Sequence, residues 1–160
     1  VFKLPSDNQT DYIKRIIGLP GDKIQVIRGV LHINDKPVRR RRIEDFGRQA
    51  DSGRFVASPQ FRETLPNGVV HAILEEYGDS GPLDNTGVFM VPQGHYFAMG
   101  DNRDNSSDSR VVESVGFIPA ANLVGRAEIL FFSTNGFARI WEIWKWPFSI
   151  RFKRILNSID

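Results

Sequence analysis

The chain has 160 residues, enough for one domain with a hydrophobic core, or for a core that carries a small inserted subdomain. Its 21 lysine and arginine residues nearly balance 19 aspartate and glutamate residues, and a formal net charge of +2 argues against a nucleic-acid partner. Without cysteine the chain forms no disulfide and no thiolate metal site, and no apolar run approaches the roughly 20 residues of a membrane-spanning helix.

The N-terminal part predicts a β-strand followed by a tight turn. Tyrosine and isoleucine favour a strand over residues 11–18, and Pro20-Gly21 is typical of a type II turn. Alternation along the strand puts Lys14 and Arg15 on opposite faces, so one of them points inward if the strand is half-buried. An inward amine must be paired or neutral, and a neutral amine is a general base. The alternative is a lysine at a strand edge that extends to water.

The next segments predict short strands separated by turns. Residues 24–33 alternate around Arg28-Gly29, which predicts a hairpin. Further extended segments are expected at 69–76, 88–91, 96–99, 111–117 and 127–133, and one helical turn at 119–124.

Residues 100–110 are the most informative segment of the chain. Three serines, three aspartates, two asparagines and two arginines follow one glycine within these eleven positions, a composition that favours turns. The segment also follows the apolar run 96–99, and a polar loop after a buried strand is a common place for catalytic or binding groups. A solvated turn and a calcium-binding acidic loop are the alternatives, but the glycine and final glutamate of an EF-hand are absent.

Two other groups of residues carry weaker signals. His32, His71 and His95 lie far apart without partners at ligand spacing, so no metal site is expected from them. Arginines 39–42 could bind an anionic lipid or nucleic acid, although a solvated strand edge is the favoured interpretation.

The C-terminal residues 141–155 interleave aromatic side chains with cations. Tryptophan prefers the membrane interface and basic residues favour anionic headgroups, so this segment could lie on a membrane. Packing of Trp141, Trp144 and Trp146 on the domain itself explains the pattern equally well.

Three motifs occur together and in one order: Tyr-Ile-Lys-Arg at 12–15, Gly-Leu-Pro-Gly-Asp at 18–22 and Gly-Asp-Asn-Arg-Asp-Asn-Ser at 100–106. In this combination the chain resembles the type I signal peptidases, the bacterial leader peptidases that use a serine–lysine dyad. The resemblance includes residues 115–119 and 122–125, and it is weakest over 39–87 and beyond 135.

The resemblance implies a mainly β fold with short helical turns. Residues 1–38 and 88–135 would form the signal-peptidase-like catalytic core, and residues 39–87 an inserted antiparallel β cap. Residues 136–160 would form a tryptophan-rich basic segment that faces the membrane.

The resemblance also assigns roles by position. Lys14 matches the family's general base, and Ser106 matches the hydroxyl that hydrogen bonds to this lysine and orients it. The remaining matches are two structural ion pairs and the strand along which the substrate lies: Arg15 with Asp101, Asp108 with Arg110, and Asp11, Tyr12 and Ile13.

One feature departs from the family pattern. The family's nucleophile is a serine, usually followed by methionine, tens of residues before the lysine motif. Only Ser6 precedes Lys14, and it lies in a polar segment that does not match. We therefore expect the nucleophile to belong to an N-terminal part outside these 160 residues, and the chain alone to be inactive. Ser107, Ser109 and Ser114 do not stand where the family has a nucleophile.

The implied activity is that of a serine endopeptidase. It would remove signal peptides, bound as an extended strand, from secreted preproteins at the outer face of the cytoplasmic membrane. The bilayer surface would be a partner, and no nucleic acid, metal or cofactor is implied. The alternatives are a related serine–lysine peptidase, such as a pilus-processing enzyme or a self-cleaving repressor, and a non-catalytic module that binds peptides or a membrane surface.

Overall fold

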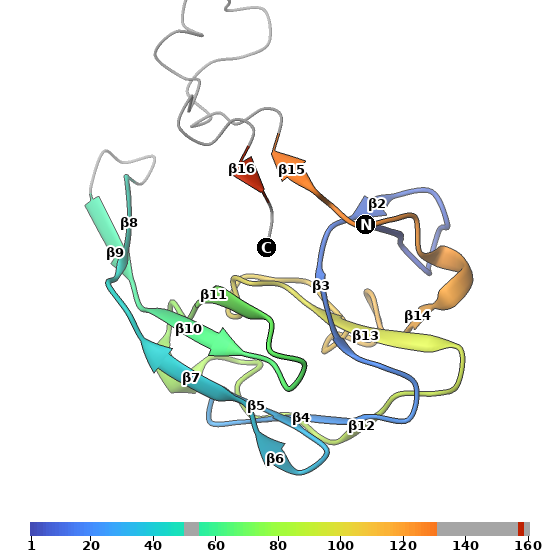
Figure 1. Cartoon of the computed structure of the whole chain (residues 1–160), viewed down its shortest axis with the longest axis horizontal. Coiled ribbons are helices and arrows are strands. Elements are labelled where there is room, and N and C mark those ends of the chain that lie inside the picture. The colour runs from blue at the N-terminus through green and yellow to red at the C-terminus, as the bar shows by residue number, and fades with distance from the viewer. Residues whose placement is uncertain (50–54, 131–156, 159–160) are drawn as a thin grey trace, which may run out of the picture. The chain divides into compact units, whose positions relative to one another are not determined.

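A computed structural model describes residues 1–49, 55–130 and 157–158 (Figure 1). The chain divides into two compact units, Val1–Gly125 and Arg126–Asp160. Short antiparallel strands dominate the described residues of the first unit, and the helices among these residues are two single turns of 3₁₀ helix. The predicted mainly β fold is confirmed.

In the first unit the strands are β1 (Phe2–Lys3), β2 (Asp11–Tyr12), β3 (Arg15–Gly18), β4 (Lys23–Ile27), β5 (Val30–Ile33), β6 (Lys36–Pro37), β7 (Arg39–Arg42), β8 (Phe46–Gln49), β9 (Phe55–Ser58), β10 (Gln60–Thr64), β11 (Val70–Leu74), β12 (Phe89–Met90), β13 (His95–Met99) and β14 (Ile118–Pro119). The 3₁₀ turns are η1 (Gly78–Ser80) and η2 (Ala120–Asn122). In the second unit, β15 (Ile129–Leu130) pairs with β16 (Asn157–Ser158).

The largest sheet has four strands in the order β12-β4-β5-β6. Its central β4–β5 hairpin turns at Arg28 and Gly29, at φ 48° and 69°, as the sequence predicts for a hairpin. Apolar side chains of this sheet pack with those of β3 and β13 in the main hydrophobic core, which consists of Ile17, Ile24, Val26, Leu31, Ile33, Val38, Leu65, Val91, Phe97 and Met99. The predicted tight turn is also present, with Gly21 at φ 89°.

A three-stranded sheet in the order β14-β13-β3 positions the polar loop. β13 is the predicted apolar run, and Phe97, Ala98 and Met99 are all buried. Because β3 and β13 are antiparallel, with Met99 opposite Arg15, the residue that precedes β3 lies beside the residues that follow β13 (Figure 1). The fold therefore brings Lys14 to the start of the 100–110 loop.

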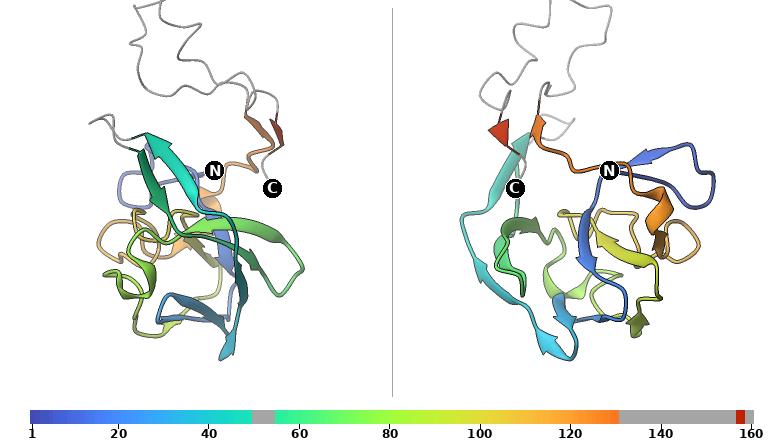
Figure 2. Two further views of the ribbon diagram at one scale, coloured as in Figure 1. Left: turned by 90° about the vertical axis from the view of Figure 1, so that its left-hand side faces the viewer. Right: turned by 45° about the vertical axis from the view of Figure 1, so that its right-hand side comes forward.

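Between residues 39 and 87 lies a separate three-stranded antiparallel sheet in the order β11-β10-β7. The β8–β9 hairpin continues β7 and β10 away from this sheet (Figure 2). At the other end, Leu74 forms a parallel bridge with Asn102, so β11 ends against the 100–110 loop. The boundaries of the inserted cap stay a prediction.

The predicted strand over residues 11–18 is interrupted in the structure. β2 pairs with β1 and ends at Tyr12, whereas β3 pairs with β13 and begins at Arg15. The chain changes partner strands at Ile13 and Lys14, which explains why these two residues belong to no strand. A strand propensity cannot report such a change of partner, because it depends on tertiary contacts.

The predicted extended segment 111–117 is wrong. The Val111 carbonyl accepts N–H bonds from Ser114, Val115 and Gly116, and Gly116 has a φ of 58°. Local hydrogen bonds thus form a tight turn in spite of the β-branched valines. The predicted helical turn near 119–124 is present as η2.

The C-terminal predictions are only partly covered by the structure. Of the strand expected at 127–133, the structure shows β15, and residues 131–156 lie outside the described residues. The aromatic and basic segment 141–155 lies there too. Among the residues that the structure describes, no helix is long and apolar enough to cross a membrane.

Candidate active site

Hydrogen bonds close the 100–110 loop at its base. The Asp108 carboxylate is fully buried and accepts the Gly100 N–H at 2.9 Å and the Arg110 Nε–H at 2.9 Å. Burial would raise the pKa of Asp108, but the bonds and charge of Arg110 outweigh it and hold the pKa below its usual range. Ser109 and Ala98 exchange two further hydrogen bonds, at 2.9 and 3.0 Å. These hydrogen bonds hold both ends of the 100–110 loop at the C-terminal end of β13.

Lys14 and Ser106 meet where this loop returns toward β3. Lys14 Nζ donates a hydrogen bond to Ser106 Oγ at 2.8 Å, and both side chains are half-buried. The Nζ atom also lies 5.8 Å from the centre of the Tyr12 ring. The structure thus brings together two residues that stand 92 positions apart.

Glycine at position 100 makes this contact possible. A Cβ atom there would lie 2.1 Å from Ser106 Oγ, 2.5 Å from Ser106 Cβ and 3.5 Å from Lys14 Nζ. The first two separations are far shorter than any ordinary van der Waals contact. The Ser106 side chain therefore packs directly against the backbone of Gly100, in space that a side chain at position 100 would occupy.

Arg15 and Asp101 form a second link between β3 and the loop. Arg15 Nε and Nη2 donate to the two carboxylate oxygens of Asp101, both at 2.9 Å. The Asp101 side chain is 46% exposed, so this pair stabilises the fold by at most about 1 kcal/mol and mainly fixes orientation. Within the described ranges, no carboxylate lies within ion-pair distance of Lys14. Its hydrogen-bond partner is a neutral hydroxyl.

A buried ion pair that sequence reasoning missed joins the loop to β10. Arg103 donates to both carboxylate oxygens of Glu63, at 3.1 and 2.5 Å, and His71 Nε2 lies 3.3 Å from Glu63 Oε2. Burial alone would raise the pKa of Glu63, but His71 and the Arg103 guanidinium outweigh it and lower the pKa to about 2. Glu63 and His71 are cross-strand neighbours in the β10–β11 hairpin, so a correct strand register would have revealed half of this cluster.

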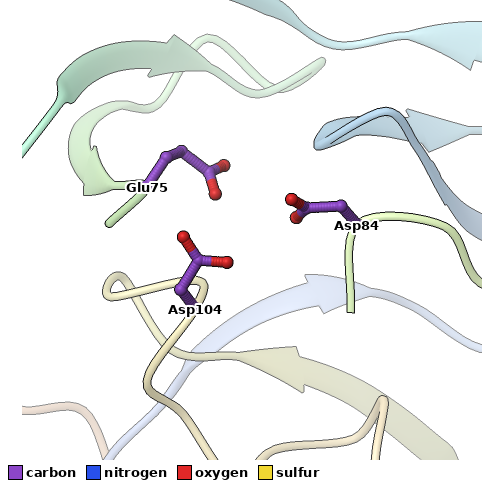
Figure 3. Close-up of side chains that lie close together, drawn as sticks. All are labelled: Glu75, Asp84 and Asp104. Carbon is purple, nitrogen blue, oxygen red and sulfur yellow. The ribbon is translucent and has the colours of Figure 1, made fainter. Parts of the chain in front are cut away.

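Three further carboxylates, Glu75, Asp84 and Asp104, gather on another side of the same loop (Figure 3). Burial and the neighbouring carboxylates raise the pKa of Glu75 to about 8. No metal ligands were predicted from the sequence, and the spacing of these three residues along the chain matches no ligand motif.

The residues matched to a substrate strand lie at the surface beside Lys14. Asp11 forms an ion pair with Lys3 at 2.8 Å, the Tyr12 ring packs 6.0 Å from that of Phe2, and Ile13 is 66% exposed. In the described part of the chain β2 pairs with β1 alone, so no described strand pairs with its second edge.

The other serines considered as nucleophiles lie away from Lys14 or have other partners. Ser6 is exposed in a turn, Ser107 Oγ lies 2.6 Å from Ser114 Oγ, and Ser109 Oγ accepts a backbone N–H inside the protein. None of these hydroxyls bonds to Lys14 within the described residues.

The fold and the site define a class of protein: mainly β, with a lysine amine hydrogen bonded to the serine hydroxyl of a polar loop. The family described as signal peptidase, peptidase S26, matches residues 1–132. The chain belongs to this family.

Individual relatives carry the same name. Signal peptidase I of Rickettsia typhi is 41% identical over 173 residues, and the alignment covers 99% of this chain. This chain spans only 63% of the length of that relative. Signal peptidase I of Rickettsia akari is 43% identical over 142 residues, which cover 84% of this chain and 50% of the relative. The chain is also similar to a signal peptidase I from Enterococcus faecalis whose crystal structure is known, with 26% sequence identity and a TM-score of 0.42. The match covers 79% of this chain and 91% of that chain.

Proposed function

We propose that the full-length protein is a serine endopeptidase that removes signal peptides from secreted preproteins. Its catalytic domain lies on the outer, periplasmic face of the cytoplasmic membrane and works at the bilayer surface. The observation that carries this proposal is the 2.8 Å contact between Lys14 Nζ and Ser106 Oγ, within a sequence that belongs to the signal peptidase family.

Lys14 acts as the general base in this mechanism. The neutral amine removes the proton from a serine hydroxyl while its oxygen attacks the carbonyl carbon of the scissile peptide bond. The same nitrogen then gives the proton to the departing amine, and water later hydrolyses the acyl-enzyme with Lys14 again as base. The contacts of Lys14 fit this role, because its hydrogen-bond partner is a hydroxyl, and the Asp101 carboxylate is bound by Arg15.

Ser106 positions the amine and is not itself attacked. Its Oγ fixes the direction of the Lys14 side chain without adding a charge. By family resemblance, the nucleophile is a serine outside these 160 residues, and Ser6, the one serine before Lys14, lies in an exposed turn. The mechanism uses no metal and no cofactor.

The preprotein binds as an added β-strand. The second edge of β2 supplies backbone groups for this pairing, and it leads directly to Ile13 and Lys14. An extended peptide at this edge brings its scissile bond to the amine. The preference for small side chains before the cleaved bond follows from family membership.

Cleavage of a preprotein tests the proposal. The full-length protein, in detergent or vesicles, converts a preprotein into mature protein and signal peptide, and mass spectrometry of both products locates the cut. The 160-residue chain alone binds a signal peptide but leaves it intact. Binding without cleavage by the full-length protein would instead favour a peptide-binding module, and cleavage restricted to pilin precursors would favour the pilus-processing alternative.

A further inference from the structure

Three carboxylates outside the Lys14–Ser106 pair converge on one point in the first unit (Figure 3). Glu75 follows β11, Asp84 lies in the loop before β12, and Asp104 belongs to the 100–110 loop. One oxygen from each lies within 4.8 Å of the other two. Glu75 and Asp84 are 0% and 1% exposed, and Asp104 is half-buried.

The nearby cations compensate this negative charge only in part. Arg40 donates to Asp79 at 2.6 Å and reaches Glu75 only at 3.3 Å. The two other buried arginines each hold a different carboxylate in a two-pronged contact: Arg103 with Glu63, and Arg110 with Asp108. When the three clustered carboxylates are ionised, negative charge therefore remains inside the protein.

An unpartnered buried oxygen points into the cluster. Glu75 Oε2 has no hydrogen-bond partner in the part of the chain that the structure describes, although its side chain is fully buried. Figure 3 shows the Glu75 carboxylate turned toward Asp104 and Asp84. Among the described residues, Asp104 Oδ1 is a second buried oxygen without a hydrogen-bond partner, whereas Asp104 Oδ2 accepts the Tyr77 N–H at 2.7 Å. Native proteins rarely leave such atoms unsatisfied, so these two oxygens point to a missing ligand of positive charge.

We propose that Glu75, Asp84 and Asp104 bind one calcium ion. A donor set of carboxylate oxygens alone selects a hard divalent cation. Oxygens on opposite sides of Ca²⁺ lie up to about 5 Å apart, compared with about 4.2 Å for Mg²⁺, so an upper limit of 4.8 Å on these separations lies within the span of a calcium site and exceeds that of a magnesium site. Water completes the coordination from the half-buried side of Asp104.

The calcium ion joins the 100–110 loop to the end of β11. Asp104 stands two residues before Ser106, and Glu75 directly follows Leu74, the last residue of β11. The ion therefore stabilises the loop that positions Ser106. Calcium binding does not depend on the proposed peptidase activity, and it can be measured on the 160-residue chain.

Calorimetric titration of the metal-free chain with CaCl₂ and MgCl₂ tests this site. We expect one calcium per chain, magnesium binding at least about tenfold weaker, and a Tm higher by about 3–6 °C at a calcium concentration tenfold above Kd. Glu75→Gln and Asp104→Asn each weaken calcium binding at least about tenfold, because each replaces a charged ligand. Asp79→Asn is the matched control, since Asp79 is 57% exposed, contacts Arg40 and lies outside the cluster.

Circular dichroism separates loss of the site from loss of the fold. Without calcium, Glu75→Gln is at least as stable as wild type, because a neutral amide of nearly the same shape replaces a fully buried carboxyl group. If Glu75→Gln fails to fold, the calcium titration of Asp104→Asn tests the site instead, since the Asp104 side chain is only half-buried. Absence of calcium heat and of a Tm shift up to about 10 mM calcium would overturn the proposal and show that protons neutralise the cluster. Unchanged calcium affinity in Asp104→Asn, or its loss in Asp79→Asn, would overturn the assignment of the ligands.

Discussion

Replacement of Gly100 by alanine should separate Ser106 from Lys14. The new Cβ would stand 2.1 Å from Ser106 Oγ, so the hydroxyl must retreat by more than about 1 Å to reach an ordinary contact distance. That movement lengthens the 2.8 Å hydrogen bond beyond the limit for such bonds. A misplacement of about 1 Å in an active site typically costs about 10²-fold in rate, equivalent to about 2.7 kcal/mol of transition-state stabilisation.

Steady-state cleavage of a preprotein by the full-length protein measures this loss. Gly100→Ala should lower kcat/KM by about 10²-fold, mostly through kcat, because the substrate edge at β2 is not altered. Gly87→Ala is the matched control, since no atom of the described residues other than its two chain neighbours lies within 4 Å of the added methyl group, and Gly87 has no positive φ. Equal kcat/KM values for Gly100→Ala and Gly87→Ala would refute the assigned contact between Ser106 and Lys14.

Three further predictions concern other parts of the molecule. Ser106→Ala should lower kcat more than it raises KM and leave measurable turnover above background in the preprotein assay; complete loss of acyl-enzyme formation would instead mark Ser106 as the nucleophile. Since the pKa of Glu63 is lowered to about 2 in the folded protein from a usual 4.5, its ionisation stabilises the fold above pH 4.5, and this contribution disappears as the pH falls toward 2. Glu63→Gln should therefore reduce the free energy of unfolding by about 3 kcal/mol at neutral pH. Urea titrations should show that the difference in unfolding free energy between this variant and wild type shrinks between pH 4.5 and 2. A difference in unfolding free energy that does not depend on pH would contradict the ion pair. Anionic liposomes should change the tryptophan fluorescence of the 160-residue chain, and unchanged emission would remove the membrane role of its three C-terminal tryptophans.

Local signals in the sequence were sufficient for the turns and for several strands. Arg28-Gly29 and Pro20-Gly21 form the turns expected from their backbone preferences, and the apolar run of β13 is buried as predicted. The valines of segment 111–117 misled the prediction, because their preference for extended backbone is weaker than the bonds to the Val111 carbonyl.

The site required information beyond local patterns. Lys14 and Ser106 stand 92 positions apart, and only the antiparallel pairing of β3 with β13 brings them together. The hydrogen bond expected between Lys14 and Ser106 was predicted from the family resemblance. No such resemblance pointed to Glu63 or Glu75, which reach the 100–110 loop from β10 and from the end of β11. Contacts of that kind depend on how sheets pack, which sequence spacing does not encode.

The most direct test of the central claim replaces Lys14 by alanine in the full-length protein and measures single-turnover cleavage of a preprotein. Lys36→Ala serves as the control, because Lys36 is an exposed lysine in β6. We predict that Lys14→Ala keeps its circular dichroism spectrum and signal-peptide affinity but loses at least about 10³-fold in cleavage rate, whereas Lys36→Ala cleaves at the wild-type rate. Cleavage by Lys14→Ala within about tenfold of wild type would contradict the role of this amine as the proton acceptor.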